Sequence, residues 1–271
     1  MDVAIVGVGN WGSSLAYGCV EASVPLREVV VRTTPEEKAG LPVVGMDDAK
    51  LDARVIWICV RDGEIGDVTE RVVARRGRLD GQIVAHSSGA LSASVLEVAK
   101  RAGARVGSVA PVMSFPTRRP VSLRGVMFAV EAEEEIAADL EVLVRKLGGE
   151  PFLIASEKKA LYHAAATMAS PLLLSEVAAA MAAAKAAGLA DELAAKWVGA
   201  LVQTTVRNFA ARGVEGSFSG PFARGDAETI RLHLQVLGAH PMLKEIYGVL
   251  AKYAVEHLPV LRRDELKEVV G

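Results

Sequence analysis

The first half of the chain alternates short β-branched or apolar runs with helical and polar stretches, a pattern that predicts a parallel sheet with crossover helices. Six strands are expected, at Val3–Val6, Glu28–Val31, Val55–Cys59, Gln82–Ala85, Arg105–Val109 and Gly125–Val130. From Glu157 onward the β-type runs stop, and long alanine-rich helical stretches follow. We therefore predict an α/β fold in two domains, with a parallel sheet in residues 1–155 and only helices in residues 156–271.

The alanine-rich run from Leu172 to Leu189 has the length of a membrane span. It carries Glu176 and Lys185, however, and alanine is only weakly hydrophobic, so we interpret it as a buried helix of a soluble protein and expect no membrane partner. Ser170 followed by Pro171 predicts that a helix restarts there with the serine as its cap. So many small side chains let another helix approach closely, which predicts a homodimer formed through the helical domain.

Charge and cysteine content narrow the classes of function. Lys and Arg number 31 against 33 Asp and Glu, so no basic surface is expected for nucleic acid or an anionic membrane. Cys19 and Cys59 are typical of buried small side chains, and no His, Cys or Asp cluster has the spacing of metal ligands. The first strand begins without a signal segment, so we expect a cytoplasmic protein. Scarce Asn and Gln beside 24% charged residues predict a thermophilic source, which a low melting temperature would contradict.

A glycine motif, GVGNWG, lies between the first expected strand and the helical stretch that follows it. In this context Gly7 permits a tight turn, Gly9 lets the backbone approach a pyrophosphate, and Gly12 allows close packing of the helix. The helix start, with Asn10 and Trp11, offers unpaired N–H groups to the anion. The motif predicts a Rossmann-type dinucleotide-binding domain, the alternative being a glycine turn without a ligand.

The residues after the second expected strand bear on which dinucleotide is bound. The acidic residue that would bind a ribose hydroxyl is missing, and Arg32, Thr33 and Thr34 stand in its place. An arginine fork and two hydroxyls suit a 2′-phosphate, so the sequence favours NADP over NAD. The alternative is that Arg32 is a solvated strand end.

A charged pair ends the third expected strand, where the carboxyl ends of parallel strands line the ligand crevice. Val60, Arg61 and Asp62 are therefore expected to border the cofactor. For the Asp62 side chain we favour a structural role, as the cap of a helix beginning near Glu64.

The next strand delivers His86, Ser87, Ser88 and Gly89 into the same crevice. Hydride reduction of a C=O or C=N group needs a proton donor or polariser near the reacting carbon, and His86 or Ser88 could supply it. Ser87 is expected beside the cofactor. The alternative makes His86 a satisfied strand-end histidine and Ser87 a helix cap.

Two candidate catalytic groups lie in the expected helical domain. His163, with Thr167 one turn later on the same face, could hold a substrate, although a lone histidine on an alanine-rich helix is more often a packing residue. Arg224 could bind an acidic substrate group bidentately, or it could pair with Asp226, which is well placed to cap the next helix. No acidic or lysine residue is expected on the His163 face.

Several segments together resemble a family of Rossmann-like NADP oxidoreductases that carry a C-terminal domain of unknown function: GVGNWG, VRD, HSSGAL, VGSVAPVMSFP, YHAAATMAS and GPFARGDAET. The resemblance implies kinship with pyrroline-5-carboxylate reductase, a helical second domain of the 6-phosphogluconate dehydrogenase C-terminal type, and an interlocked dimer. Two positions depart from it, because relatives have histidine where this chain has Ala110 and asparagine where it has Pro171.

The sequence thus predicts an NADP-dependent oxidoreductase that transfers hydride to or from a small oxo acid or imine. One alternative is pyrroline-5-carboxylate reductase, from which the chain departs at Gly220–Asp226, where that enzyme would show a Pro-Gly-Gly-Thr-Thr run. Another is a non-catalytic protein that binds or senses NADP. A third, an interaction protein with a vestigial nucleotide site, predicts that the glycine loop binds nothing.

Overall fold

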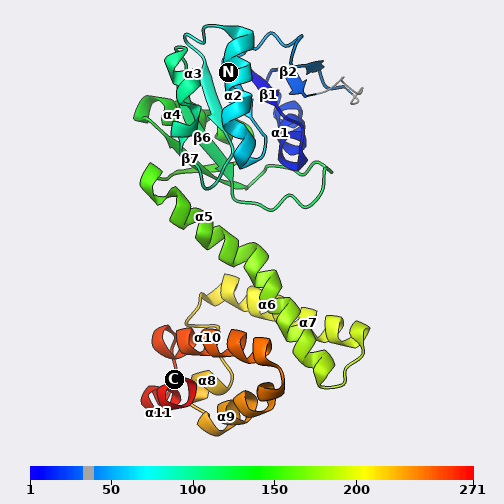
Figure 1. Ribbon diagram of the computed structural model, residues 1–271, viewed down its shortest axis with the longest axis vertical. Coiled ribbons are helices and arrows are strands. Elements are labelled where there is room, and N and C mark those ends of the chain that lie inside the picture. The colour runs from blue at the N-terminus through cyan, green and yellow to red at the C-terminus, as the bar shows by residue number, and fades with distance from the viewer. Residues whose placement is uncertain (33–39) are drawn as a thin grey trace. The chain divides into compact units, whose positions relative to one another are not determined.

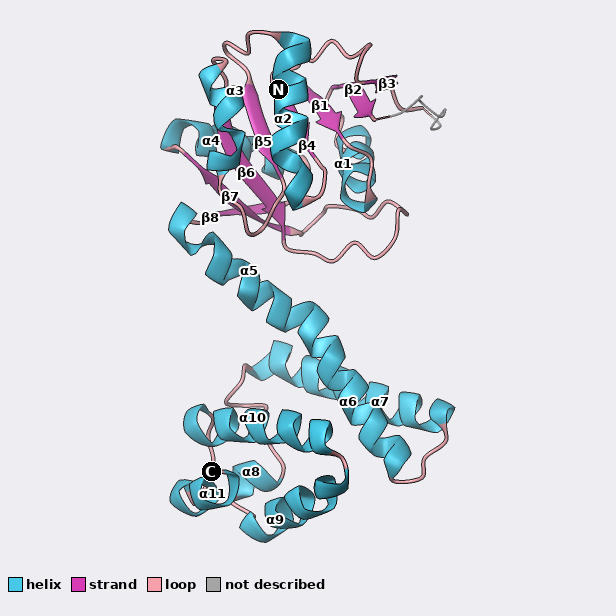
Figure 2. Cartoon of the chain, viewed as in Figure 1, coloured by secondary structure: helices cyan, strands magenta, loops and turns pink. Residues whose placement is uncertain are grey.

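A computed structural model describes residues 1–32 and 40–271 of the chain. The chain divides into two compact units, Met1–Met168 and Ala169–Gly271 (Figure 1). The first unit contains the sheet, and the second consists of helices and their connections (Figure 2). This is the α/β fold with a following helical region that the sequence predicts. The first turns of the long helix pack against the sheet and belong to the first unit.

The sheet has eight strands in the order β3-β2-β1-β4-β5-β6-β7-β8. Their bounds are Val3–Val6, Leu26–Val31, Val43–Gly45, Val55–Ile58, Ile83–His86, Arg105–Pro111, Met127–Ala132 and Glu150–Leu153, for β1 to β8 in turn. All neighbouring pairs are parallel except β6 with β7, which corrects the expectation of a wholly parallel arrangement. The six expected strands are confirmed. The two additional strands lie at the edges of the sheet, where Pro151 of β8 is tolerated.

Helices cover both faces of the sheet. One core joins α1 (Asn10–Glu21) and α4 (Glu134–Lys146) to one face and encloses Trp57 and Phe128. The other joins α2 (Ile65–Arg76) and α3 (Glu97–Arg101) to the opposite face. Both faces of the central strands are therefore apolar, which explains why those strands are nearly continuous runs of Val and Ile.

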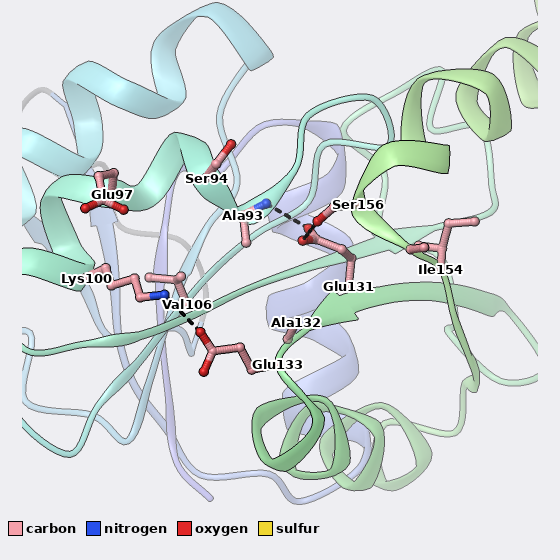
Figure 3. Close-up of a pocket in the computed structure, with 11 residues that line it drawn as sticks. Ala93, Ser94, Glu97, Lys100, Val106, Glu131, Ala132, Glu133, Ile154 and Ser156 are labelled. Atoms are coloured by element: carbon pink, nitrogen blue, oxygen red, sulfur yellow. Dashed lines mark hydrogen bonds and ion pairs between the residues drawn. The ribbon is translucent and has the colours of Figure 1, made fainter.

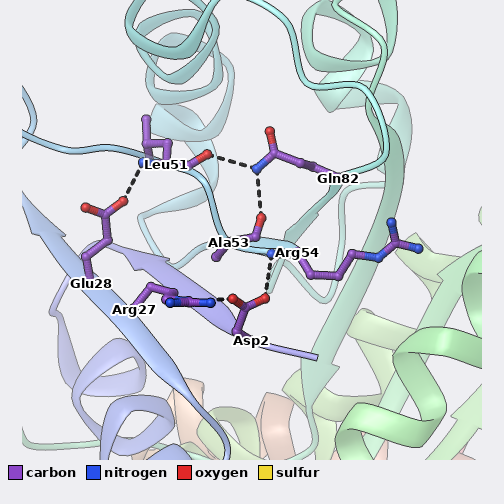
Figure 4. Close-up of polar contacts among 7 residues, drawn as sticks. All are labelled: Asp2, Arg27, Glu28, Leu51, Ala53, Arg54 and Gln82. Atoms are coloured by element: carbon purple, nitrogen blue, oxygen red, sulfur yellow. Dashed lines mark hydrogen bonds and ion pairs between the residues drawn. The ribbon is translucent and has the colours of Figure 1, made fainter.

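The amino edge of the strands is closed by side-chain contacts to the loop before β4 (Figure 4). The Asp2 carboxylate accepts from Arg27 and from the backbone N–H of Arg54. Glu28 accepts from the Leu51 N–H, and Gln82 donates to the Leu51 carbonyl at 2.8 Å. These polar groups serve the fold, and they leave the carboxyl edge of the strands as the place for a ligand.

The long helix runs through Pro171 without restarting, contrary to the sequence prediction. Helix α5 (Lys159–Thr167) continues through a π-helical turn, Met168–Leu172, into α6 (Leu173–Ala186). A π turn absorbs the clash and the missing N–H that proline brings to a helix interior. Ser170 therefore lies inside the helix and does not cap it.

The second unit continues with α7 (Asp191–Arg212), α8 (Pro221–Arg224), α9 (Ala227–Val236), α10 (Pro241–His257) and α11 (Arg263–Val270). Its core is small, with Ile230, Val255 and Leu266 among its buried members. The stretch Ser156–Ala186 is long and apolar enough to cross a membrane, and none of its most apolar window is buried in the single chain. The expectation of a buried helix is therefore wrong for one copy of the chain.

Candidate functional site

The glycine loop forms an open cradle at the carboxyl end of β1. Gly7 has φ +106°, and a Cβ on it would lie 2.6 Å from the Cys59 carbonyl oxygen. A Cβ on Gly12 would lie 2.1 Å from the Gly7 oxygen. By contrast, a Cβ on Gly9 would meet no atom within 4 Å, and its φ of −73° suits any residue. Gly7 and Gly12 are thus required by the fold, whereas Gly9 leaves a space that a ligand can occupy.

The start of α1 has the features of an anion-binding site. Gly9 is its N-cap and provides no side-chain hydrogen bond, and the first turn contains no acidic residue. The first N–H groups of a helix are unpaired and carry a partial positive charge. This uncapped helix start beside the open face of Gly9 fits the pyrophosphate of a dinucleotide.

Asn10 and Trp11 do not point into this cradle but hold neighbouring loops around it. The Asn10 amide donates to the Phe115 carbonyl at 2.7 Å, and the Trp11 ring lies 5.2 Å from the Phe115 ring. The Trp11 indole N–H donates to Ser87 Oγ at 2.7 Å, and the Trp57 indole N–H donates to the same oxygen at 2.8 Å. Ser87 is thus a structural junction between the glycine loop and the end of β5, and it caps no helix.

His86 ends β5 and is completely buried. Its Nδ1 accepts from the Ser88 N–H at 3.0 Å, so its Nε2 carries the proton and donates to the Ser92 carbonyl at 3.1 Å. Burial lowers the pKa of His86 from 6.5 to about 4. A neutral ring with both nitrogens engaged and no exposure corresponds to the satisfied strand-end histidine, and it offers no proton to a substrate.

This histidine should make the protein sensitive to acid. The unfolded chain binds more protons than the folded chain between pH 4 and 6.5, so stability present above pH 6.5 is lost as the pH falls toward 4. We expect the free energy of unfolding to fall by about 3 kcal/mol over this window through His86 alone. Urea unfolding of wild type and His86→Gln at several pH values measures it. Equal pH dependence of the two proteins would contradict this assignment.

Ser88 links the loop after β5 to the turn after β4. Its hydroxyl donates to Asp62 Oδ2 at 2.8 Å and accepts from the N–H groups of Ala90 and Leu91. Asp62 belongs to a 3-10 turn, Asp62–Glu64, and caps neither that turn nor α2. The predicted capping role of Asp62 is therefore wrong, because its carboxylate is taken up by the hydroxyl of the neighbouring loop.

Lys159, which sequence reasoning missed, lies directly beneath this loop. It is the first residue of α5, has no exposed surface, and donates from Nζ to the Ser88 carbonyl at 3.0 Å and to Ser108 Oγ at 2.6 Å. Burial lowers the pKa of Lys159, while Glu131 and Asp62 oppose that shift. Lys159 precedes His163 by four residues, so the expectation that the His163 face has no lysine is wrong. That spacing was the signal available in the sequence.

His163 contacts the same loop one helical turn further along α5. A Cβ on Gly89 would be 2.6 Å from His163 Nδ1, so the absence of a side chain at Gly89 gives the ring its place. His163 is exposed, and Thr167 turns its hydroxyl back to the His163 carbonyl at 2.9 Å. The structure thus brings Ser88, Lys159 and His163 together around one loop, with only His163 open to solvent.

Of the three residues expected near the ribose, the structure describes Arg32. Arg32 follows β2, is exposed, and pairs with Glu64, whose pKa is lowered by the guanidinium. Thr33 and Thr34 lie outside the described residues. Val60 packs beside Gly7, and a Cβ on that glycine would lie 2.9 Å from Val60 Cγ1, while Arg61 is exposed after β4. These residues stand at the carboxyl edge of the sheet, as expected.

Arg224 ends α8 in the second unit. The predicted cap of the next helix is confirmed, because Asp226 accepts from the Thr229 N–H at 3.1 Å and from Thr229 Oγ1 at 2.8 Å. These two bonds, more than Arg224, lower the pKa of Asp226.

A cleft of about 370 Å³ is lined by residues from α3, β6, β7 and the segments next to them, and none of the lining residues belongs to the glycine loop (Figure 3). Its charged groups are already engaged: Lys100 pairs with Glu133 at 2.9 Å, and Glu131 accepts from the Ala93 N–H at 2.7 Å and from Ser156 Oγ. Within residues 1–32 and 40–271, no group of His, Cys, Asp and Glu could hold a metal ion. The glycine cradle is therefore the better candidate site.

Comparison with solved structures supports the fold. A protein from Thermotoga maritima is 20% identical with a TM-score of 0.74, the alignment covering 99% of this chain and 98% of that one. A reductive aminase from Aspergillus terreus, in complex with NADPH and ethyl-5-oxohexanoate, is 15% identical with a TM-score of 0.68 and 98% of both chains covered. Pyrroline carboxylate reductase from Plasmodium falciparum, with NADP bound, is 14% identical with a TM-score of 0.60, covering 100% of this chain and 98% of that chain.

Comparison with protein families gives two matches along the chain, while no curated protein matches it. Residues 1–111 match the Rossmann-like domain, and they include the glycine loop and strands β1 to β6. Residues 126–254 match a domain of unknown function, DUF2520. The chain is therefore a Rossmann-like domain followed by a DUF2520 domain, the combination that its sequence motifs resemble.

Proposed function

We propose that this protein is an NADP-dependent oxidoreductase that transfers hydride to or from a small oxo acid or imine. The observation that carries the proposal is the open space at Gly9, which lies at the uncapped start of α1. The loop after β5 contacts two side chains of α5, the buried Lys159 and the exposed His163. A nicotinamide cofactor bound there would supply the hydride. The reductases among the structural relatives support the same class of reaction.

The residues around the cradle divide into those that hold the cofactor and those that face a substrate. Gly9 and the first N–H groups of α1 would bind the pyrophosphate, and Arg32 would bind the 2′-phosphate. His163 is the proton donor or polariser we favour, because it is exposed beside Gly89. Lys159 holds α5 and the Ser88 carbonyl together and so positions that histidine.

The identity of the cofactor is tested by one substitution. Arg32→Ala should weaken NADPH binding about tenfold or more and leave NADH binding nearly unchanged, because a guanidinium bound to the 2′-phosphate is lost. Nicotinamide fluorescence during titration of both proteins with both cofactors measures this. Equal losses for NADPH and NADH would remove Arg32 from the 2′-phosphate site, and binding of neither cofactor to wild type would overturn the proposed function.

Turnover separates the proposed enzyme from its alternatives. NADPH oxidation should occur with a 2-oxo acid and amine, or with a cyclic imine, and pyrroline-5-carboxylate belongs in the panel because that reductase shares the fold. Selective turnover of pyrroline-5-carboxylate would favour that enzyme. Tight NADPH binding without turnover on any of these compounds would favour a sensing role.

We further propose that two copies of the chain pair through the helical unit. Large apolar side chains are exposed on its helices, including Leu174 on α6 and Trp197 and Leu201 on α7, with Trp197 51% exposed. A surface of this kind needs a partner in water. Light scattering after size exclusion should give the mass of two chains for wild type and one for Trp197→Lys/Leu201→Lys. A wild-type mass of a single chain would exclude the dimer.

A further inference from the structure

The connection between β6 and β7, which we call the strap (residues 112–126), runs along helix α1. The Asn10 amide holds its first part through the Phe115 carbonyl at 2.7 Å. Ser14 holds its second part, accepting from the Val121 N–H at 3.3 Å. Both anchors on the helix lie in its first two turns, so the strap between them passes the end of α1 that faces the glycine cradle.

The far end of the strap is fixed still more firmly. Leu123 is completely buried against α1, and a Cβ on Gly18 would lie 2.6 Å from its Cδ1. Ser122 and Arg124 both interact with Glu21 at the end of the helix. The strap is therefore attached to α1 at several points along the helix.

Five exposed residues lie between the two anchors, and they include Arg118 and Arg119. Pro116 and Pro120 flank the pair and fix the backbone φ angle on both sides. Neither guanidinium lies within ion-pair distance of a carboxylate in the described part of the chain. The two arginines thus stand on a segment whose two anchors lie at the start of α1, and that helix start is itself positive and has no acidic residue in its first turn.

Several positive charges close together favour the binding of an anion with more than one negative charge. We propose that Arg118 and Arg119 are further ligands of the dinucleotide and contact its pyrophosphate, an inference that rests on the proposed function. Arginine suits phosphate oxygens through its planar fork of donors. The pyrophosphate is favoured over the 2′-phosphate because the anchors of the strap lie at the start of α1, whereas the 2′-phosphate is expected beyond β2 at Arg32.

The test compares Arg118→Ala/Arg119→Ala with wild type and with Arg78→Ala/Arg101→Ala. The control removes the same charge from exposed arginines that precede β5 and β6, at the opposite edge of the sheet. Calorimetric titrations with NADPH and NADH should show about 30-fold weaker binding of both cofactors to the strap variant, and no such loss in the control. The salt dependence of NADPH binding should also become shallower in the strap variant.

Comparison of the NADPH and NADH affinities distinguishes failure of this inference from failure of the proposed function. Binding of both cofactors to the strap variant within twofold of wild type would overturn this inference and leave the proposed function standing. A loss for NADPH alone would place the arginines at the 2′-phosphate and overturn the pyrophosphate assignment. Binding of neither cofactor to wild type would overturn the inference together with the proposed function. An unchanged melting temperature confirms that the variant is folded.

Discussion

Replacement of Gly9 by valine is expected to abolish tight NADPH binding while the protein stays folded. The backbone of Gly9, with φ −73°, accepts any residue, and its Cβ position is empty of protein atoms within 4 Å. A valine side chain would therefore project into the space assigned to the pyrophosphate. NADPH affinity should fall at least about 100-fold, equivalent to about 2.7 kcal/mol. Fluorescence titration measures the affinity, and urea unfolding should show a loss of no more than about 1 kcal/mol from the weaker helix cap.

Gly12→Ala is the matched comparison for this prediction. Its Cβ would lie 2.1 Å from the Gly7 oxygen, so the turn must distort, and the free energy of unfolding should fall by about 3 kcal/mol or more. The two variants thus separate a glycine that the fold needs from one that the ligand needs. Wild-type affinity in Gly9→Val would show that no ligand occupies this face of the loop.

Removal of the buried ammonium of Lys159 is expected to have the second large effect. Lys159→Ala leaves a cavity and deprives the Ser88 carbonyl and Ser108 hydroxyl of a donor, so the free energy of unfolding should fall by about 3 kcal/mol. Lys159→Met fills the volume and should cost about 1 kcal/mol. Turnover should fall about 100-fold in both, because the loop bearing Gly89 and the helix bearing His163 lose their common anchor. NADPH affinity should change little.

The pH dependence of stability distinguishes the charge of Lys159 from its packing. Because burial lowers the pKa of Lys159 below 10.5, the unfolded chain binds more protons between the folded-state pKa and that value. Wild type should therefore gain stability relative to Lys159→Met as the pH rises through this window. A constant difference between the two proteins would mean that the ammonium is not desolvated, and full activity in Lys159→Met would contradict its positioning role.

The fold was predictable as far as hydrophobic patterning specifies it. The six central strands are buried on both faces, so their sequences are apolar runs that stand out. Strand β3 is only three residues long, and β8 contains a proline, so neither has a recognisable pattern. Strand β7 returns antiparallel to β6 after the strap, and the strap is bonded to α1 by residues about a hundred positions apart, which no local pattern reveals.

The sequence predicted those site residues that the backbone conformation requires. It did not predict the roles of residues that depend on a partner far away in the sequence. Gly7 and Gly12 are steric necessities, so the motif located the cradle correctly. The partners of Asp62, Ser87 and Lys159 come from segments far away in the sequence, and the residues around each give no sign of them. The proline within the long helix misled in a similar way, because a π turn accommodates it.

Hydrogen exchange with and without NADPH tests the central claim most directly, because it locates the bound cofactor. The first N–H groups of α1 lack partners within the helix, so they should exchange quickly in the free protein. Saturating NADPH should slow exchange of the Asn10, Trp11 and Gly12 amides, with weaker protection after β4 and β5. No change at these three amides would contradict the account, since the cofactor would then bind elsewhere or not at all.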